Sequence, residues 1–456
     1  MKKVKTTTNF VCQECGYDSP SWLGKCPECG EWSSMKEIHL AKDTSSRGQG
    51  LSAQTSAKPQ KLHEIAYSKT SRMQTNFIEL NTVLGGGIVA GSVSLIAGDP
   101  GVGKSTLLLQ LALGLAGSSK KVLYVSGEES VEQIKMRAER IQKQELGGKN
   151  QGQDDENLLL LSLTDTDAIV GQIEEIKPDL VIIDSIQTIE SQNTSGLSGS
   201  VAQVRYGALQ FVRSAKALNI PIILVGHVTK EGMVAGPMVL SHMVDTVLFL
   251  EGEKFAKTRI LRSLKNRFGP VDEVGIFIMD EEGMVDAINP EQLFLSSSDT
   301  IKGKTPGSVL VSTLEGSRAF LVELQALTVA TKLPMPRRVV SGIDPRRVEL
   351  LLAVLQKHCH VPLDSVDVFV NVAGGIKLAD PAIDLGICLA VYSSFANVPL
   401  GSVVGVAEVG LLGELRQVSG IEKRKKETEK MGFKHIITAK THKSLADVIR
   451  EVKGKT

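Results

Sequence analysis

The segment Gly98–Thr106, with the sequence GDPGVGKST, constrains the fold of this chain more than any other stretch. It matches the pattern G-x-x-x-x-G-K-[ST] at every fixed position. The apolar run Val93–Ala97 precedes it and a helical stretch, Leu107–Ala116, follows it, which is the strand–loop–helix context of a phosphate-binding loop. Glycines let backbone N–H groups surround phosphate oxygens, and the helix N-terminus adds partial positive charge. A Gly-rich strand–helix turn without a ligand is the alternative.

We expect the whole loop to bind a nucleoside triphosphate. In this interpretation Lys104 reaches the outer phosphates and the Ser105 hydroxyl is a ligand of magnesium. The residues expected to contact the nucleotide here are Gly98, Asp99, Pro100, Gly101, Val102, Gly103, Lys104, Ser105 and Thr106.

Four of the six cysteines lie close together near the N-terminus and form two C-x2-C pairs, separated by ten residues. Each pair is followed by glycine, and two such turns can present four thiolates tetrahedrally, as a structural zinc ion prefers. The loop between the pairs is shorter than in the commonest zinc sites. Disulfides are the alternative, which a reducing cytosol disfavours. The expected zinc ligands are Cys12, Cys15, Cys26 and Cys29, whereas Cys359 and Cys388 are expected to be buried free thiols.

Length and composition limit the class of protein. A chain of 456 residues exceeds one ordinary core and predicts two or three domains. The net charge of +1 neither favours nor excludes a nucleic-acid partner. The N-terminus has no apolar segment typical of a secretory signal, and no run approaches the roughly 18 apolar residues of a membrane span. The sequence therefore predicts a cytoplasmic protein without a membrane partner.

The apolar runs predict an α/β fold. Near-continuously apolar segments alternate with helical patterns, as in the parallel strands of a doubly wound sheet, whose ligands bind at the carboxyl ends of the strands. Composition changes near residues 40 and 290, which indicate linkers. The predicted organisation is a zinc module at 1–39, a linker at 40–64, an ATPase domain at 65–290, a second linker at 291–305, and an α+β domain at 306–456.

Two carboxylates follow apolar runs where they could act on the nucleotide. The stretch Asp179–Asp184 reads DLVIID, and an Asp at the tip of a buried strand beside the loop holds magnesium through water. An ordinary turn Asp is the alternative for Asp184. The run Val122–Val125 leads to Glu128, our expected general base for the attacking water, whereas Glu129 could begin the next helix.

Two further motifs are expected near the nucleotide. His227 ends the run that begins at Pro221 and is expected to hydrogen-bond the γ-phosphate, with a structural histidine as the alternative. The segment KNRFG at 265–269 places Lys265 and Arg267 beside a Phe-Gly turn. It is either a solvated basic turn or a pair of cations that completes the site of a neighbouring subunit in a ring ATPase.

Taken together, these motifs make the chain similar to the bacterial RadA/Sms family of DNA repair ATPases over nearly its full length. The resemblance rests on the four-cysteine knuckle, GDPGVGKST, DLVIIDS and KNRFG. It implies a RecA-like ATPase core and homo-hexameric rings like those of DnaB-type helicases. It also implies ATP, Mg²⁺ and Zn²⁺ as cofactors, and branch migration on single-stranded and branched DNA in cooperation with a RecA-type recombinase. By the same resemblance, Lys265 and Arg267 act in trans, or KNRFG contributes to DNA binding.

The C-terminal domain resembles the proteolytic domain of Lon, without its catalytic pair. Ala382 stands where the resemblance places the nucleophilic serine, and Glu422 stands where it places the lysine. Without a hydroxyl the covalent mechanism cannot start. We expect a scaffold with a basic face, and the candidate phosphate contacts, each of which could equally be a solvated charge, are Arg337, Arg338, Arg346, Arg347, Lys423, Arg424, Lys425 and Lys426.

Three functions remain open from sequence. The first is an ATP-driven DNA motor, with DNA threading a ring lined by the loops Ser191–Ser200 and Thr229–Pro237, the first of which we expect to be mobile. Aromatic residues make up only 4% of the chain, so backbone and charge contacts should dominate over base stacking. The second is a nucleotide-switched DNA-binding scaffold without motor activity. The third is an ATP-dependent protease, against which Ala382 argues.

Overall fold

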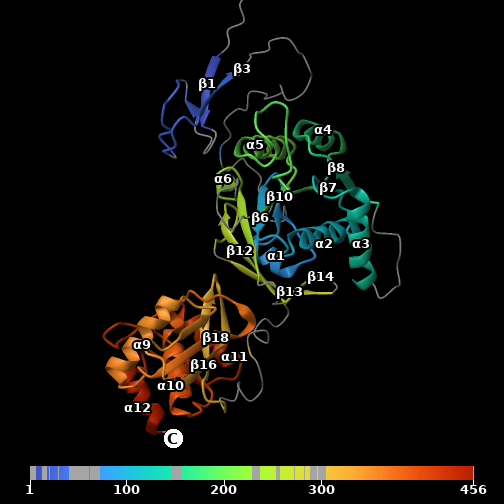
Figure 1. Ribbon diagram of the computed structural model, residues 1–456. Coiled ribbons are helices and arrows are strands. Elements are labelled where there is room, and N and C mark those ends of the chain that lie inside the picture. Colours follow the sequence, from blue (N-terminus) through green and yellow to red (C-terminus); the bar gives the residue numbers. More distant parts are fainter. Residues whose placement is uncertain are drawn as a thin grey trace, which may run out of the picture. The chain divides into compact units, whose positions relative to one another are not determined.

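The computed structural model describes residues 7–12, 18–19, 21–28, 30–40, 61, 72–145, 156–227, 237–252, 257–271, 273–281, 283–287, 295 and 304–454. They form two compact units, and Figure 1 shows their helices and strands. The first comprises Met1–Asn76, Gly86–Ala97 and Leu111–Val247, and the second comprises Phe77–Gly85, Gly98–Gln110 and Leu248–Thr456. The predicted linkers at 40–64 and 291–305 lie almost entirely outside the described residues.

Parallel strands form the centre of the first unit. Strand β7 (Val122–Ser126) pairs with β8 (Leu158–Ser162) and β9 (Leu180–Asp184), and β9 pairs with β10 (Ile222–His227), all in parallel. Every residue of β7 and β9 is buried, as expected for strands covered on both faces. The helices that connect successive parallel strands are α3 (Val131–Glu145), α4 (Thr166–Ile176) and α5 (Val201–Leu218). The predicted alternation of strand and helix is confirmed.

These strands belong to a nine-stranded sheet with the order β14-β13-β12-β11-β6-β10-β9-β7-β8. Strand β6 (Val93–Gly98) lies next to β10 and leads through the glycine-rich loop into α2 (Lys104–Gly117). This combination is a RecA-like P-loop core of the α/β class, as predicted. The remaining short elements of this region are β4 (Arg72–Met73), β5 (Ile88–Val89) and α6 (Pro237–Ser241).

The second unit adds an antiparallel extension that the sequence did not predict in full. Strand β12 (Thr258–Asn266) pairs with β13 (Val274–Asp280), and β13 pairs with β14 (Gly283–Asp286). Strand β11 spans Thr246–Glu251. Helix α1 (Ile78–Val83) packs on β12 and β13, and the Asp286 carboxylate accepts the N–H groups of Ile78 and Glu79. Asp286 thus caps the helix from a strand more than 200 residues away.

The C-terminal part of the second unit is an α/β domain built on a six-stranded sheet of the order β17-β18-β16-β15-β19-β22. The mixture of strands and helices expected for residues 306–456 is confirmed. A 3-10 turn, Pro381–Ile383, leads into the central helix of this domain, and Asp380 caps the turn. The sheet contains β15 (Ser308–Glu315), β16 (Arg318–Ala330), β17 (Arg338–Ser341), β18 (Val366–Val372), β19 (Val403–Val406) and β22 (His435–Thr438), and the other elements are α9 (Pro345–Cys359), η2 (Ala373–Gly375), α10 (Asp384–Ala396), β20 (Glu408–Val409), β21 (Leu415–Arg416), α11 (Ile421–Lys430) and α12 (Leu445–Gly454).

The N-terminal module is a small antiparallel sheet of three strands, β2-β1-β3. They span Asp18–Ser19, Thr7–Cys12 and Met35–Leu40, respectively. Within the described parts of the chain, no helix combines the length and the apolar character needed to cross a lipid bilayer.

Candidate functional site

Two glycines of the phosphate-binding loop disfavour a side chain, Gly98 because of the neighbouring backbone and Gly103 mainly because of its own backbone conformation. A Cβ atom at Gly98 would lie 2.3 Å from the carbonyl oxygen of Leu250, and one at Gly103 would lie 2.4 Å from Met279 Cε. Gly103 has φ +112° and Gly101 has φ +77°, a region that favours glycine. A Cβ at Gly101 would meet nothing within 4 Å. The base of the loop is therefore packed against its surroundings, and the loop is open around Gly101, where a phosphate could approach the backbone.

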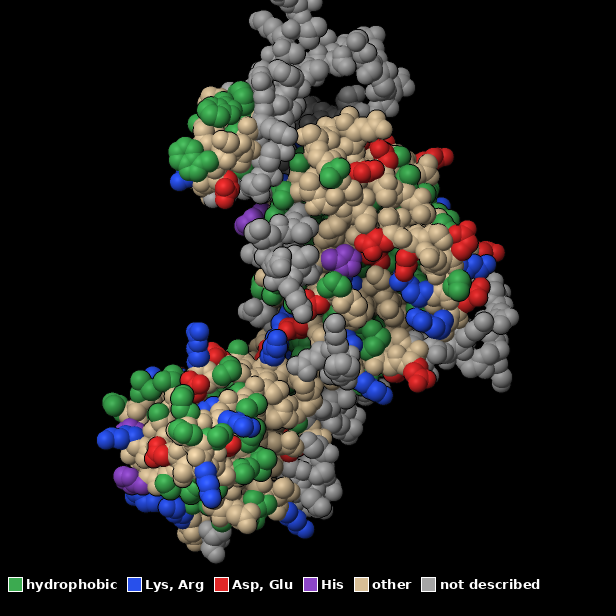
Figure 2. Space-filling view, viewed as in Figure 1, with side chains coloured by type: hydrophobic (Ala, Val, Ile, Leu, Met, Phe, Trp, Pro, Cys, Tyr) green, Lys and Arg blue, Asp and Glu red, His purple; other side chains and the backbone are tan. Residues whose placement is uncertain are grey.

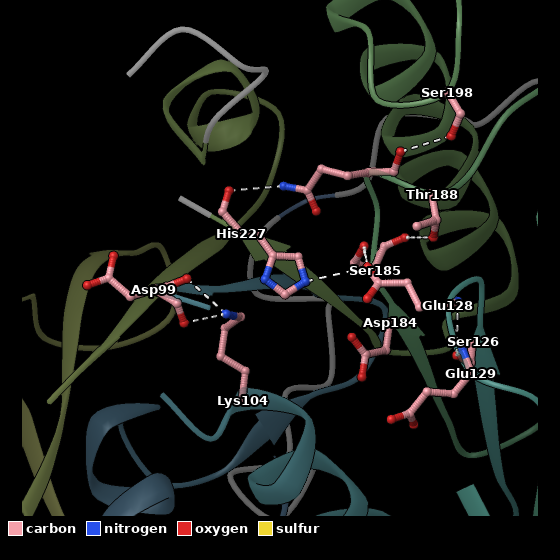
Figure 3. A network of polar contacts seen from close by, with 12 residues as sticks. Asp99, Lys104, Ser126, Glu128, Glu129, Asp184, Ser185, Thr188, Ser198 and His227 are labelled. Carbon is pink, nitrogen blue, oxygen red and sulfur yellow. Dashed lines mark hydrogen bonds and ion pairs between the residues drawn. The ribbon is translucent and has the colours of Figure 1, made fainter. Parts of the chain in front are cut away.

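Lys104 is held inside this loop. Its Nζ donates to the carbonyl oxygens of Gly98 at 2.8 Å and Asp99 at 3.0 Å (Figure 3), and the side chain is buried. Arg259 of β12 stabilises the loop from the other end, since its Nε donates to the Val102 carbonyl at 2.9 Å. Burial lowers the pKa of the Arg259 guanidinium. Sequence analysis missed Arg259 because it belongs to no motif.

The Glu128 carboxylate lies in a polar cluster at the ends of three parallel strands, β7, β9 and β10. Ser185 Oγ donates to Glu128 Oε1 at 2.7 Å, and His227 Nε2 lies 3.6 Å from the same oxygen (Figure 3). Ser126 Oγ accepts the N–H groups of Glu128 and Glu129. The structure thus brings together Glu128 and His227, as the sequence predicted for both strand ends, and adds Ser185, which the sequence did not single out.

Asp184 has a partner that no motif indicated. Tyr124, in the middle of β7, donates its hydroxyl to Asp184 Oδ2 at 2.6 Å, and both side chains are buried. Burial raises the pKa of Tyr124 well above its usual value, and the Asp184 charge raises it further. The phenol therefore stays protonated and can donate to the carboxylate. Tyrosine within an apolar run looks like an ordinary core residue, which is why the sequence did not indicate it.

The neighbouring Glu129 is engaged elsewhere. Its carboxylate forms an ion pair of 3.0 Å with Arg137 of α3, which itself begins at Val131. Glu129 therefore precedes the helix and stabilises it through a side chain two turns further on. This leaves Glu128 as the better candidate for a general base.

The loop expected at Ser191–Ser200 is irregular, as predicted, but several hydrogen bonds hold it in place. The Gln203 amide donates to the carbonyl oxygens of Ser191, Thr194 and Gly196, and its oxygen accepts the Ser191 N–H. These bonds argue against the expected mobility of this loop. The other loop expected to contact DNA, Thr229–Pro237, lies outside the described residues except for Pro237.

A hydrogen-bond chain joins this loop to His227. Gln187 Nε2 donates to the His227 carbonyl at 3.1 Å, and Ser198 Oγ donates to the Gln187 carbonyl at 3.2 Å (Figure 3). A displacement of the end of β10 should therefore be transmitted to Ser198 through Gln187.

The KNRFG motif divides into a structural half and an exposed half. Asn266 is buried and donates to the Leu84 carbonyl at 3.2 Å, while its oxygen accepts the Phe268 N–H at 3.0 Å. A Cβ at Gly269 would lie 2.8 Å from the Asn266 amide and 3.1 Å from Gly85 Cα. Asn266 and Gly269 therefore fasten the turn to the end of α1. Lys265 is half-buried and Arg267 is exposed, and their expected role in trans stays a prediction.

The C-terminal domain was expected to lack the protease nucleophile, and the surroundings of Ala382 agree with this expectation. This residue is fully buried and packs with Leu321 and Phe433. Glu422, in contrast, is exposed. The position therefore offers neither a hydroxyl nor access to a peptide.

Three of the eight basic residues expected to contact phosphate serve the domain itself. Arg424 is only 1% exposed and bonds to the Ser312 carbonyl and to Asp380, so the prediction is wrong for this residue. Arg347 pairs with the buried Asp384, and Arg338 donates to the carbonyl oxygens of Val366 and Leu363. On the visible face of this domain, lysine and arginine side chains are interspersed with hydrophobic ones (Figure 2). The remaining exposed or half-buried candidates are Arg337, Arg346, Lys423, Lys425 and Lys426.

Two of the four predicted zinc ligands are described. Cys12 and Cys26 are buried in one cluster with Met35. Gly30, with φ +76°, donates its N–H to the Cys26 carbonyl at 2.9 Å, which closes the tight turn expected after a C-x2-C pair. Cys15 and Cys29 lie outside the described residues. Two buried thiols supply half of the four ligands that a structural zinc site requires.

The cysteines of the C-terminal domain are buried free thiols, as predicted. Burial raises the pKa of Cys359 to about 11 and that of Cys388 well above its usual value.

Comparison with known proteins decides the family. Residues 57–233 match the model of an AAA domain, and residues 10–37 match a rubredoxin metal binding domain. The DNA repair protein RadA of Bacillus subtilis is 47% identical over 437 residues, which cover 95% of this chain and 93% of that protein. This chain belongs to the RadA family of DNA repair proteins. The RadA of Listeria monocytogenes is 45% identical over 99% of this chain and 96% of its own length.

The RadA family assignment agrees with the resemblance seen in the sequence. The match to a metal binding domain includes the two C-x2-C pairs, and the AAA match includes the loop, Glu128 and Asp184. A crystal structure of the RadB recombinase aligns with 47% of this chain at 25% identity and a TM-score of 0.37. The assignment of a RecA-like core rests on the sheet order and the loop described above.

Proposed function

We propose that this member of the RadA family is a DNA-dependent ATPase of DNA repair and homologous recombination. It would process recombination intermediates by ATP-driven branch migration or by helicase-like translocation on single-stranded DNA. The observation that carries the proposal is the Ser185-bound Glu128 carboxylate at the end of β7. Strand β6, which leads directly into the phosphate-binding loop, belongs to the same sheet. In open α/β sheets ligands bind beyond the carboxyl ends of such strands.

Each residue has a chemical task in this proposal. Bound magnesium would neutralise phosphate charge and would be held by Ser105 and, through water, by Asp184. Lys104 would bind the outer phosphates. Glu128 would accept the proton of the attacking water. Because Ser185 and His227 both approach Oε1, we assign that proton to Glu128 Oε2.

Several parts of the proposal extend beyond one chain. Lys265 and Arg267 would act on the nucleotide of a neighbouring subunit in a homo-hexameric ring, and His227 would report the γ-phosphate to the Ser191–Ser200 loop through Gln187. The N-terminal thiols would bind a structural zinc ion. The partners would be single-stranded and branched DNA and a RecA-type recombinase, in the cytoplasm, where the cysteines stay reduced.

A nucleotide-switched scaffold without motor activity is the second candidate. None of the contacts described above favours such a scaffold over a motor. Proteolysis is disfavoured because Ala382 supplies no nucleophile.

The test is ATP turnover with and without single-stranded DNA, together with strand displacement on a forked duplex. We expect DNA to stimulate turnover, and we expect Lys104→Ala to lose at least about 10²-fold of it because charge stabilisation of the transferred phosphoryl group is lost. The Lys104→Ala variant should keep its circular dichroism spectrum. Turnover that ignores DNA would contradict the motor, and wild-type turnover in Lys104→Ala would remove the proposed nucleotide site.

A further inference from the structure

The contact between Tyr124 and Asp184 has features of a positioning device. In the parallel pair β7·β9, Tyr124 is level with Ile182, and Ser126 is level with Asp184. Side chains two residues apart share a face of the sheet. The Tyr124 ring therefore reaches diagonally along the neighbouring strand, so that its hydroxyl meets the carboxylate at the strand's end.

The chemistry of this hydrogen bond leaves a single arrangement. An ionised carboxylate can only accept, so the phenol must donate its one proton. The separation of 2.6 Å between the two oxygens lies in the range of charge-assisted O–H···O⁻ bonds, which are about twice as strong as neutral ones. Tyr124 is fully buried, and its strand is paired with a neighbour on each side. The bond therefore restrains the Asp184 carboxylate through its Oδ2 atom.

We propose that Tyr124 is a positioning residue for Asp184, which holds the carboxylate in the orientation that binds the water shell of nucleotide-bound magnesium. This inference rests on the proposed function, since it needs Asp184 to act on the metal. Tyr124 itself touches neither metal nor nucleotide in this scheme. Groups that hydrogen-bond a side chain bound directly to a metal typically contribute about 10- to 100-fold to metal affinity, and since Asp184 acts through water we take the lower end of that range here.

The chain supplies a matched control for removing the hydroxyl. Tyr206 donates its hydroxyl to Asp167 Oδ1 at 3.3 Å, at the surface between α5 and α4. Tyr124→Phe and Tyr206→Phe thus delete the same atom from two tyrosine–aspartate hydrogen bonds, and only the first concerns Asp184. Phenylalanine keeps the ring, so the volume of the core changes little.

The experiment measures Mn²⁺ binding to the full-length protein in the presence of a saturating, non-hydrolysable ATP analogue, by the electron paramagnetic resonance signal of free Mn²⁺. We expect Tyr124→Phe to raise the Kd for Mn²⁺ by about tenfold or more, and Tyr206→Phe to leave it unchanged. Binding of a fluorescent ATP analogue in excess EDTA should be the same in all three proteins, because the hydroxyl acts only through the metal. In an Asp184→Asn background, adding Tyr124→Phe should produce no further loss, because the two residues act as one unit.

The outcomes separate this inference from the proposed function. If the wild-type protein binds no Mn²⁺ with the analogue, the proposed nucleotide site fails. If it does bind Mn²⁺ and Tyr124→Phe stays within twofold of it, the positioning role is refuted while the function stands. A Tyr124→Phe variant that fails to fold also refutes the inference, since the hydroxyl would then serve the core of the protein.

Discussion

Replacing Arg347 by methionine should destabilise the C-terminal domain, although sequence alone marks this residue as a surface charge. Arg347 is paired with Asp384 through two bonds, and Asp384 is only 1% exposed. The same carboxylate accepts the Val409 N–H at 3.1 Å. Methionine keeps the packing of the arginine stem but removes the guanidinium. The variant therefore leaves a buried carboxylate without its counter-charge.

The magnitude follows from that burial. Removing one partner of a buried ion pair costs about 3–5 kcal/mol. Because the Arg347 side chain is 34% exposed and solvent screens its charge, we expect the lower end of this range, about 3 kcal/mol or roughly 10²-fold in an opening equilibrium. Burial already raises the pKa of Asp384, and Arg347 opposes this shift. Without Arg347, the pKa of Asp384 in the folded state rises further above its value in the unfolded state. At low pH the buried carboxyl group is neutral and is tolerated. As pH rises through the folded-state pKa, the carboxyl group ionises and the loss of stability grows. The loss should be larger at pH 8 than at pH 5.

Hydrogen exchange followed by mass spectrometry on the full chain measures this locally. Amides of α10 should lose protection in Arg347→Met, whereas Arg346→Met should leave protection unchanged, because Arg346 is exposed and adjacent. Adding Asp384→Asn to Arg347→Met should restore much of the protection, since an amide can still accept the Val409 N–H without a buried charge. Unchanged α10 protection in Arg347→Met would refute the reasoning. Loss of DNA affinity without loss of protection would instead support the phosphate contact expected from the sequence.

Two further predictions concern the cysteines. Cys26→Ser should lower the zinc content measured by atomic emission and leave the thermal unfolding of the ATPase core unchanged, and equal zinc in variant and parent would contradict a thiolate site. Because burial raises the pKa of Cys359 from 9.0 to about 11, its thiolate fraction at pH 8 falls about 100-fold, and iodoacetamide should label it at least that much more slowly in the native than in the unfolded protein. Labelling should accelerate about tenfold for each unit of pH below the pKa, and equal rates in the native and unfolded states would contradict the buried thiol.

The residues of the candidate site that sequence could predict are those whose role depends on local chain geometry. The loop at 98–106 carries its own strand and helix signals, and Asp184 and Glu128 stand directly after apolar runs. Tyr124 and Arg259 could not be predicted in this way. Their partners lie 60 and 157 residues away, respectively, and only strand order and register bring them together.

The same limit explains the basic residues of the C-terminal domain. Arg424 sits in the run Lys423–Lys426, which has the composition of a solvated helix face. One helical position of that run nevertheless turns inward, where Asp380 and the Ser312 carbonyl satisfy the guanidinium. Composition describes the run as a whole, whereas the direction of each side chain depends on packing. Fold class was predictable because the strand and helix pattern repeats over many residues.

The capping of α1 by Asp286 has a consequence for biogenesis. The helix starts at Ile78, but its N–H groups find their acceptor only 208 residues later, and Asn266 closes the other end of the same helix. At a synthesis rate of about 5–20 residues per second, a ribosome needs roughly 10–40 s to add that acceptor. During this interval the nascent polypeptide exposes the apolar face of an unfinished helix. A chaperone that shields this segment, or a pause in translation that delays it, would therefore influence the yield of native protein.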